Sequence, residues 1–363
     1  TYAFAEYGHA NFFYLNRSQP QPFSTVLVLS NCAVRISIKV VSSYGLTSPP
    51  PSLGIRASTR ITQLMPTRRV VCTGIGMASP LGLNLSSSWA ALTSLQCGIS
   101  NLPTPPTSSI YDEKLQSTLP SQVAGSIAPH ASLSPRTDRS RFISLALLAA
   151  HEAIAHSNLS PHSSPSLDLD ECGVAIGTGI GSLNDIVSAS RTLSTRGLRR
   201  LSPHFVPNVL CNLAAGHVSQ EFGFRGPNHC VSTACATGAH AVGDAFRFIK
   251  HGDANVMLAG GTESSLDPLS IGGFCRLRAL STKFNDDPKK ASRPFDSQRD
   301  GFVISEGSTV LVLEELEHAV SRGAPILAEI VGYGVSGDGY HKTAPDPTGS
   351  GAFRAMKKAA REG

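Results

Sequence analysis

Short apolar runs that stop at closely spaced glycines are the feature that most constrains the fold of this chain. Runs of this kind occupy residues 69–73, 172–177 and 255–259, and glycines end or follow each of them. Two further apolar runs occupy residues 308–315 and 326–333. Apolar runs of this length, bounded by turn-forming residues, are typical of buried β-strands.

Segments with the spacing of helices lie between these strands. Residues 142–156 carry apolar side chains at helical intervals, and residues 237–250 also read as a helix. Strands that alternate with helices predict an α/β fold with mostly parallel sheets. The strand-and-glycine pattern near residue 69 recurs loosely at 328–334, which hints at an internally duplicated fold. We interpret the Pro/Ser-rich segment 101–141 as a surface excursion.

Residues 1–67 differ in composition from the rest of the chain. The segment is rich in Ser, and residues 1–68 hold six basic residues against Glu6 alone. This composition is typical of an organelle transit peptide. A non-native upstream segment, with Met65 as the true start, is an equal alternative. In both cases we expect residues 1–67 to be largely disordered, without a place in the fold.

The rest of the chain carries no net charge, since residues 1–68 account for the whole formal charge of +5. A neutral remainder predicts no nucleic-acid partner. No apolar run reaches the roughly 18–20 residues that a membrane helix needs, so we expect no membrane span. Hydrophobic residues make up 41% of the chain and charged residues 16%, which is the balance of a globular enzyme.

Eight cysteines are spread along the chain without a C-x-x-C pair or a zinc-binding Cys/His spacing. We therefore expect free thiols and no metal site. Cys235 stands where a strand passes into the predicted helix, in its first turn. A helix N-terminus carries about half a positive charge and free N–H donors, which favour a thiolate and an oxyanion. An inert buried cysteine stays an open alternative on these grounds.

The predicted helix after Cys235 is dense in small residues, among them Gly238 and Gly243. A glycine inside a helix costs about 1 kcal/mol relative to alanine, so two of them indicate close packing against another backbone. We therefore predict a buried central helix. Cys230, which we place in the middle of the preceding strand, we interpret as structural.

An ordered set of sequence blocks carries a resemblance to one family. The block that ends in Val231-Ser-Thr-Ala-Cys-Ala-Thr-Gly follows Gly-Pro-Asn-His-Cys. Further blocks lie at 69–82, 177–181, 260–263, 278–281, 292–303, 310–315 and 337–345. In this order they resemble the type II β-ketoacyl-acyl carrier protein synthases, over about residues 68–363. Residues 198–203 and the insert at 101–141 resemble the mitochondrial branch most.

The resemblance implies a fold and an assembly. The fold is α/β and thiolase-like, with αβαβα layers built from two similar halves. We expect residues 68–318 to form the N-terminal half, which holds the nucleophile. Residues 319–363 are then the start of a C-terminal half that is only partly present. The family resemblance also implies a homodimer.

The reaction implied by the resemblance is a decarboxylative Claisen condensation in fatty-acid biosynthesis. Cys235 takes an acyl chain from acyl carrier protein, malonyl-carrier protein decarboxylates, and its carbanion attacks the acyl-enzyme. The expected partner is therefore acyl carrier protein, and no cofactor is implied. Ile180 and Phe274 match positions that line the acyl pocket, and Thr343 matches one near the pantetheine arm.

Two catalytic histidine segments of the family do not occur in this sequence. They read H-[AG]-T-S-T and G-H-L-x-G-A-A-G, and a C-terminal G-F-G-G loop is also missing. We therefore expect a C-terminally incomplete chain that lacks the two catalytic histidines. The alternative function is a truncated isoform that cannot condense and that binds acyl carrier protein or the full-length synthase.

Two other activities and the cellular location complete the sequence-based expectations. The glycines at 177–181 lack the last glycine and the acidic residue of a dinucleotide-binding site, so we disfavour that site. A thiolase acting on coenzyme A thioesters would share the fold and the cysteine. The amino-acid sequence around Cys235 favours enzymes that act on carrier-protein thioesters. We expect a mitochondrial location, with the plastid as the alternative.

Overall fold

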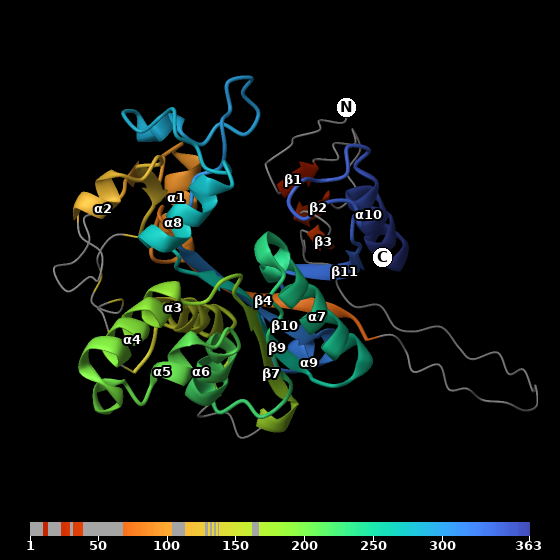
Figure 1. Cartoon of the computed structure of the whole chain (residues 1–363). Coiled ribbons are helices and arrows are strands. Elements are labelled where there is room, and N and C mark those ends of the chain that lie inside the picture. The colour runs from red at the N-terminus through yellow and green to blue at the C-terminus, as the bar shows by residue number, and fades with distance from the viewer. Residues whose placement is uncertain are drawn as a thin grey trace, which may run out of the picture.

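The computed structural model describes residues 68–103, 113–127, 138–161 and 167–363, together with residues 130, 133 and 136. Of residues 1–67 it describes the backbone of three strands, β1 Ala10–Phe13, β2 Phe23–Leu29 and β3 Cys32–Ile38. Figure 1 shows strands at the centre of the molecule with helices around them.

The elements after residue 68 follow the order that the apolar runs predict. The strands are β4 Val70–Ala78, β5 Ile99–Asn101, β6 Val123–Gly125, β7 Cys172–Gly177, β8 Asn228–His229, β9 Val256–Glu263, β10 Gly307–Glu315 and β11 Ala328–Val335. The α-helices are α1 Leu85–Thr93, α2 Glu113–Ser117, α3 Arg141–His156, α4 Leu183–Arg196, α5 Phe205–Val209, α6 Leu213–Phe222, α7 Thr237–His251, α8 Pro268–Arg276, α9 Leu316–Ser321 and α10 Ser350–Glu362. The five predicted strands are β4, β7, β9, β10 and β11, and the two predicted helices are α3 and α7, so these predictions are confirmed.

The main sheet is mixed, so the prediction of mostly parallel sheets is wrong. Its strand order is β1-β2-β3-β11-β4-β10-β9-β7-β8. Among the described strands of this sheet, the only parallel pairs are β7 with β8 and β7 with β9. Strand β10 runs antiparallel to both β4 and β9. Parallel neighbours need a crossover that packs on the sheet. Between β9 and β10 the chain instead runs through α8, whose buried apolar residue Ile271 belongs to a separate cluster, and returns in the opposite direction.

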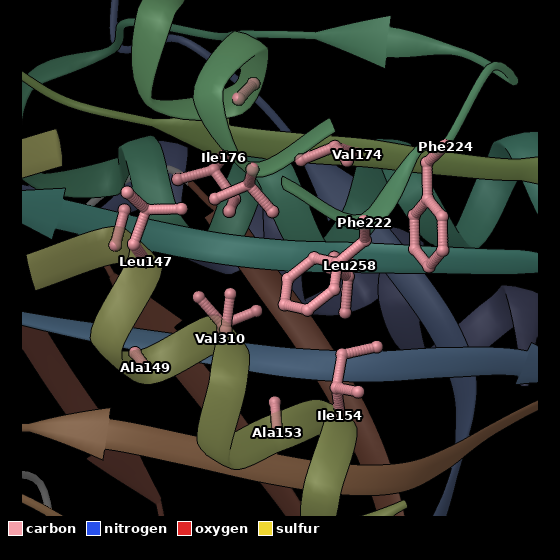
Figure 2. Packing of buried hydrophobic residues seen from close by; sticks show 14 of the residues in the cluster. Leu147, Ala149, Ala153, Ile154, Val174, Ile176, Phe222, Phe224, Leu258 and Val310 are labelled. Carbon is pink, nitrogen blue, oxygen red and sulfur yellow. The ribbon is translucent and has the colours of Figure 1, made fainter. Parts of the chain in front are cut away.

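Helices α3 and α6 cover one face of the sheet and α7 covers the other. Val256 and Leu258 of β9 lie in the cluster formed with α3 and α6. Met257, between them, lies in the cluster formed with α7. This alternation is what a strand buried on both faces requires. Figure 2 shows the first cluster, with Phe222 of α6 and Ile154 of α3 close to the strands.

Two glycines of β4 allow α3 to approach the sheet closely. An alanine at Gly74 would place its Cβ 2.3 Å from the carbonyl oxygen of Ala153. At Gly76 the corresponding atom would lie 2.0 Å from the carbonyl oxygen of Ala149. Any side chain at these two positions would therefore push the helix away from the strand.

The same arrangement recurs between β11 and α10. A Cβ at Gly332 would lie 2.1 Å from the carbonyl oxygen of Ala359, and one at Gly334 would lie 2.0 Å from that of Ala355. The recurrence agrees with the duplicated strand-and-glycine pattern in the sequence.

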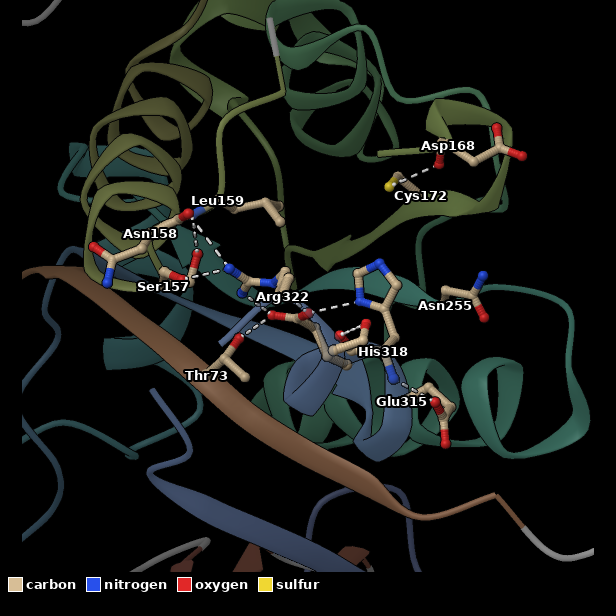
Figure 3. Close-up of polar contacts among 12 residues, drawn as sticks. Thr73, Ser157, Asn158, Leu159, Asp168, Cys172, Asn255, Glu315, His318 and Arg322 are labelled. Atoms are coloured by element: carbon tan, nitrogen blue, oxygen red, sulfur yellow. Dashed lines mark hydrogen bonds and ion pairs between the residues drawn. The ribbon is translucent and has the colours of Figure 1, made fainter. Parts of the chain in front are cut away.

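A buried carboxylate joins β10 to β4 and α3. The side chain of Glu314 has no exposed surface and accepts hydrogen bonds from Thr73, His318 and Arg322. The distances to His318 Nδ1 and Arg322 Nε are 2.9 and 2.8 Å. Arg322 also donates to the carbonyl oxygen of Ser157 at 3.0 Å, at the end of α3. Figure 3 shows Thr73, His318 and Arg322 converging on this carboxylate.

These contacts decide the charge state of Glu314. Burial alone raises the pKa of its carboxyl group, but the hydrogen bonds from Arg322, His318 and Thr73 outweigh burial and lower the pKa to about 2. Glu314 is therefore ionised at neutral pH and forms a buried ion pair with Arg322.

Two segments differ from the sequence-based expectation. Strand β3 pairs antiparallel with β11, β2 pairs with β3, and β1 pairs with β2. These three strands therefore have a place in the sheet, and the remainder of residues 1–67 lies outside the described residues. Within the supposed surface excursion 101–141, Val123 is buried, and the amide of Gly125 donates to the carbonyl oxygen of Ile304 at 2.9 Å. Residues 123–125 therefore belong to the core, and the prediction of a surface excursion is wrong for them.

Among the helices that the structure describes, none combines the length and the apolar character needed to cross a membrane.

Candidate active site

Cys235 lies where the sequence places it, at the turn that leads into α7. The 3-10 helix Ala234–Ala236 continues directly into Thr237–His251. Ala234 has a φ of 52°, in the left-handed region that disfavours residues with a Cβ. The turn leaves Cys235 exposed. Cys230 lies just after β8 and not in the middle of a strand, which corrects its predicted position.

A carboxylate at the end of β9 holds the loop beside this turn. Glu263 accepts hydrogen bonds from the hydroxyl of Thr178 at 3.0 Å and from the amides of Gly179 and Ile180 at 2.8 and 3.2 Å. A Cβ at Gly179 would lie 3.6 Å from the Cα of Ala234. The ends of two parallel strands, β7 and β9, therefore meet the start of α7 at the cysteine. This edge is where α/β sheets commonly bind ligands.

Two features of the surroundings of Cys235 act against the thiolate that the helix N-terminus favours. Partial burial raises the pKa of the Cys235 thiol, the hydrogen bond of its own backbone amide opposes this rise, and the negative charge of Glu263 adds to it. A helix N-terminus alone predicts a lowered pKa. Burial and the charge of Glu263 therefore oppose the effect expected from the helix N-terminus, and the thiolate stays a prediction.

Two glycines of α7 make the close contacts that the sequence predicts. A Cβ at Gly261 of β9 would lie 3.1 Å from the Cα of Gly238, so helix and strand backbones approach each other there. A Cβ at Gly243 would lie 2.1 Å from the ring of Tyr333. Helix α7 is a buried central helix, as predicted, although the second glycine faces a ring and not a backbone.

The three predicted substrate-binding residues lie in three different segments of the structure. Ile180 lies in the loop held by Glu263, next to the cysteine turn. Phe274 lies on α8 with its ring edge-on to Phe302, 5.4 Å between centroids. The amide of Thr343 donates to His341 in its own exposed loop at 3.2 Å. Among the described residues, neither Phe274 nor Thr343 has a hydrogen bond or ring contact with the cysteine turn.

Sequence reasoning missed Glu263 as part of the site. The signal was present, since a single carboxylate follows the buried run 256–262 directly. A charged residue at the carboxyl end of a buried strand is placed to bind the loop of the neighbouring strand.

Within the part of the chain that the structure describes, no cluster of three His, Cys, Asp or Glu side chains is placed to hold a metal ion.

A match to a family model identifies the class of protein to which this chain belongs. The family model described as "Beta-ketoacyl synthase, N-terminal domain" matches residues 67–319. The chain therefore belongs to the β-ketoacyl synthase family, and its α/β fold is thiolase-like.

Individual relatives agree with this assignment. The chain is 49% identical over 308 residues to the mitochondrial 3-oxoacyl-[acyl-carrier-protein] synthase of Arabidopsis thaliana, covering 81% of this chain and 66% of that protein. It is 47% identical over 304 residues to 3-oxoacyl-[acyl-carrier-protein] synthase 2 of Rhizobium meliloti, covering 80% of this chain and 70% of that protein. The chain thus spans about two thirds of the length of these relatives.

A solved structure shows a similar fold. It contains the acyl-carrier protein of a type II polyketide synthase in complex with its ketosynthase bound to the hexaketide. The similarity has a TM-score of 0.70 at 32% identity and covers 82% of this chain and 70% of that chain.

Proposed function

We propose that this chain acts as a β-ketoacyl-acyl carrier protein synthase of fatty-acid biosynthesis, with Cys235 as the residue that accepts the acyl group. The observation that carries the proposal is the position of Cys235. Its thiol is exposed on a left-handed turn at the start of a buried helix, at the edge where β7 and β9 end. The names of the two relatives support the same activity.

The step that these residues support is transfer of the acyl chain to the cysteine. The Cys235 sulfur attacks the thioester carbonyl of acyl-carrier protein, and the bond between that carbonyl and the carrier thiol breaks. The carrier leaves as a free thiol, which takes up the proton that Cys235 loses. In this proposal the Cys235 amide, at the start of α7, donates a hydrogen bond to the oxyanion that forms during the attack. Condensation with malonyl-carrier protein would follow on the acyl-enzyme and would also need the two catalytic histidine segments, which do not occur in this sequence.

Three further properties belong to the proposal. Acyl carrier protein is the partner, which agrees with the complex seen in the similar ketosynthase structure. The location is the mitochondrion, supported by the name of the Arabidopsis relative. Ile180 contributes to the acyl pocket beside Cys235, as its place in the Glu263-bound loop favours. The roles of Phe274 and Thr343 in substrate binding, the division at residues 318 and 319, and the homodimer stay predictions.

Intact-mass measurement of the whole chain after incubation with acyl-acyl carrier protein tests this proposal. We expect the mass of one acyl group on the wild-type chain and no added mass on the Cys235→Ala variant. The Cys230→Ala variant serves as the matched control, because Cys230 lies five residues earlier, and we expect it to accept the acyl group normally.

Two outcomes contradict the assignment. An acyl group on the Cys235→Ala variant would show that another residue is the nucleophile. A folded wild-type chain that binds acyl carrier protein without accepting its acyl group would favour the binding-only alternative.

A further inference from the structure

Thr233, the residue just before the left-handed Ala234, makes two hydrogen bonds to the helix that follows. Its amide donates to the hydroxyl of Thr237 at 2.8 Å. Its hydroxyl oxygen lies 2.7 Å from Nδ1 of His240. Both partners belong to α7, so the turn is fixed to the first two turns of that helix.

His240 is in turn held from its other side by β11. Its ring lies edge-on to the ring of Tyr333, with centroids 6.4 Å apart. The Tyr333 hydroxyl donates to Asp244, one helical turn further along α7, at 3.2 Å. Gly243 allows this close approach of the Tyr333 ring. The imidazole of His240 is therefore held between the Tyr333 ring on one side and the Thr233 hydroxyl on the other.

The hydrogen bond also has a defined direction. Nε2 of His240 is buried and has no hydrogen-bond partner within the described residues. A buried N–H without an acceptor costs more free energy than a buried nitrogen lone pair, because the N–H is the stronger hydrogen-bonding group and loses its hydrogen bond to water. The proton therefore belongs on Nδ1, which donates to the Thr233 hydroxyl. Burial lowers the pKa of His240, with Asp244 opposing, which agrees with a neutral ring.

We propose that His240 is a positioning residue, whose Nδ1–H···Oγ hydrogen bond to Thr233 holds the turn at Ala234 and thereby sets the direction of the Cys235 sulfur. An alanine in the left-handed region persists only where surrounding contacts hold it there. The two hydrogen bonds of Thr233 are such contacts. The inference rests on the proposed role of Cys235 but assigns no chemical step to His240.

The alkylation rate of Cys235 by iodoacetamide, at fixed pH in the whole chain, tests the inference. Intact mass gives the rate, and peptide masses locate the label on Cys235. We expect His240→Ala and Thr233→Val each to slow alkylation about tenfold, as the loss of one hydrogen bond allows. Because both changes remove the same bond, we expect the double variant to be no slower than either single variant.

Conservative variants separate positioning from stability. The side-chain N–H of asparagine lies close to the position of Nδ1, so we expect His240→Asn to react within about threefold of the wild type. We expect the same of Thr233→Ser, which keeps the hydroxyl. Urea midpoints of all variants are measured in parallel to show that each is folded.

The inference is overturned if folded His240→Ala and Thr233→Val variants react as fast as the wild type, or faster. It is also overturned if His240→Asn and Thr233→Ser are as slow as the variants that lack the bond. Iodoacetamide needs no carrier protein. Failure of the proposed function therefore shows separately, as a wild-type chain that is alkylated at Cys235 but is not acylated by acyl-carrier protein.

Discussion

The strand–helix pairs β4–α3 and β11–α10 use the same contacts in two different surroundings. In both, two glycines separated by one residue face two alanines separated by three residues on the helix. In both pairs the residue between the two glycines, Ile75 or Tyr333, also bonds to the helix. Its amide donates to a side chain that lies three positions after the second alanine. His156 Nδ1 accepts from Ile75 at 3.3 Å, and Glu362 accepts from Tyr333 at 3.0 Å.

A second polar contact between helix and strand occurs in both pairs, but the donor and acceptor roles are exchanged. Glu152 of α3 accepts from the amide of Met77 at 2.8 Å. At the equivalent place in α10, Lys358 donates to the carbonyl oxygen of Val335 at 3.0 Å. A carboxylate binds a strand N–H in one pair, and an ammonium group binds a strand C=O in the other. The register of helix on strand is therefore set by the backbone approach and not by one particular polar side chain.

The two pairs differ in how deeply they are buried. Helix α3 buries ten residues, including Phe142, Ile143 and Leu145. Helix α10 buries only Gly351, Ala355 and Ala359, and its Phe353 is 60% exposed. Close glycine–alanine contact therefore fixes the geometry of a pair, whereas the large side chains on the rest of the helix decide how much the pair contributes to stability.

The largest expected difference concerns the carboxylates that anchor the two pairs. Glu314 is fully buried against Arg322, whereas the side chain of Glu362 is 25% exposed beside Lys250. We expect Glu314→Gln to lower the free energy of unfolding by about 3 to 5 kcal/mol, because Arg322 then keeps a charge without its buried partner. We expect Glu362→Gln to cost under about 1 kcal/mol. Urea unfolding followed by circular dichroism measures both.

Asp287→Asn is the control for these two substitutions. It removes a carboxylate from an exposed pair with Lys290, so we expect no measurable change. Equal losses for Glu314→Gln and Glu362→Gln would show that the two anchors do not differ as their burial suggests.

A smaller difference is expected at the strand glycines. Gly76→Ala brings a Cβ against the backbone of α3, which is packed on its other sides, and we expect a loss of about 3 kcal/mol in the free energy of unfolding. Gly334→Ala makes an equally short contact with α10. We expect a loss of only about 1 kcal/mol there, because the exposed helix can shift away from the strand.

Gly337→Ala is the matched control, since a Cβ at this position meets nothing within 4 Å. Its unfolding midpoint should stay close to that of the wild type. If Gly334→Ala costs as much as Gly76→Ala, helix α10 is held as firmly as α3, and the contrast between the two pairs is lost.

The last difference concerns the dependence of stability on pH in acid. The pKa of Glu314 is lowered from 4.5 to about 2, so the folded state binds this proton less readily than the unfolded state. Its stabilisation is fully present above about pH 4.5 and is lost as the pH falls towards 2. Between these values, the wild type should lose up to about 1.4 kcal/mol per pH unit more than Glu314→Gln. Parallel slopes of unfolding free energy against pH for the two chains would contradict the assigned ion pair.

The positions of the strands could be predicted from the sequence, but their directions could not. An apolar run such as that of β10 indicates burial, and burial is the same in either direction. The burial of Val123–Gly125 was equally hidden, because its partner Ile304 lies far along the chain and leaves no local signal. Pairing of this kind depends on tertiary contacts that override local composition.

The site was predictable to a similar extent. The junction before α7 locates Cys235, because a helix start is a local feature. The direction of its pKa shift depends on Glu263 and on burial, which are tertiary features. The sequence places His240 on the same helix as Cys235. Its hydrogen bond to Thr233 depends on the left-handed conformation of Ala234, which an alanine in the sequence does not predict.

The central place of β4 in the sheet has a consequence for synthesis of the chain. Thr73 and its partner Glu314 are 241 positions apart, and both neighbours of β4, β10 and β11, lie in the last part of the sequence. At a ribosomal rate of 5–20 residues per second, β4 waits on the order of ten to fifty seconds for its first neighbour. During that time an uncharged, β-prone segment has both edges unpaired, which makes it a template for other nascent strands. Protection of β4 on the ribosome is therefore a requirement that this strand order imposes before any catalysis begins.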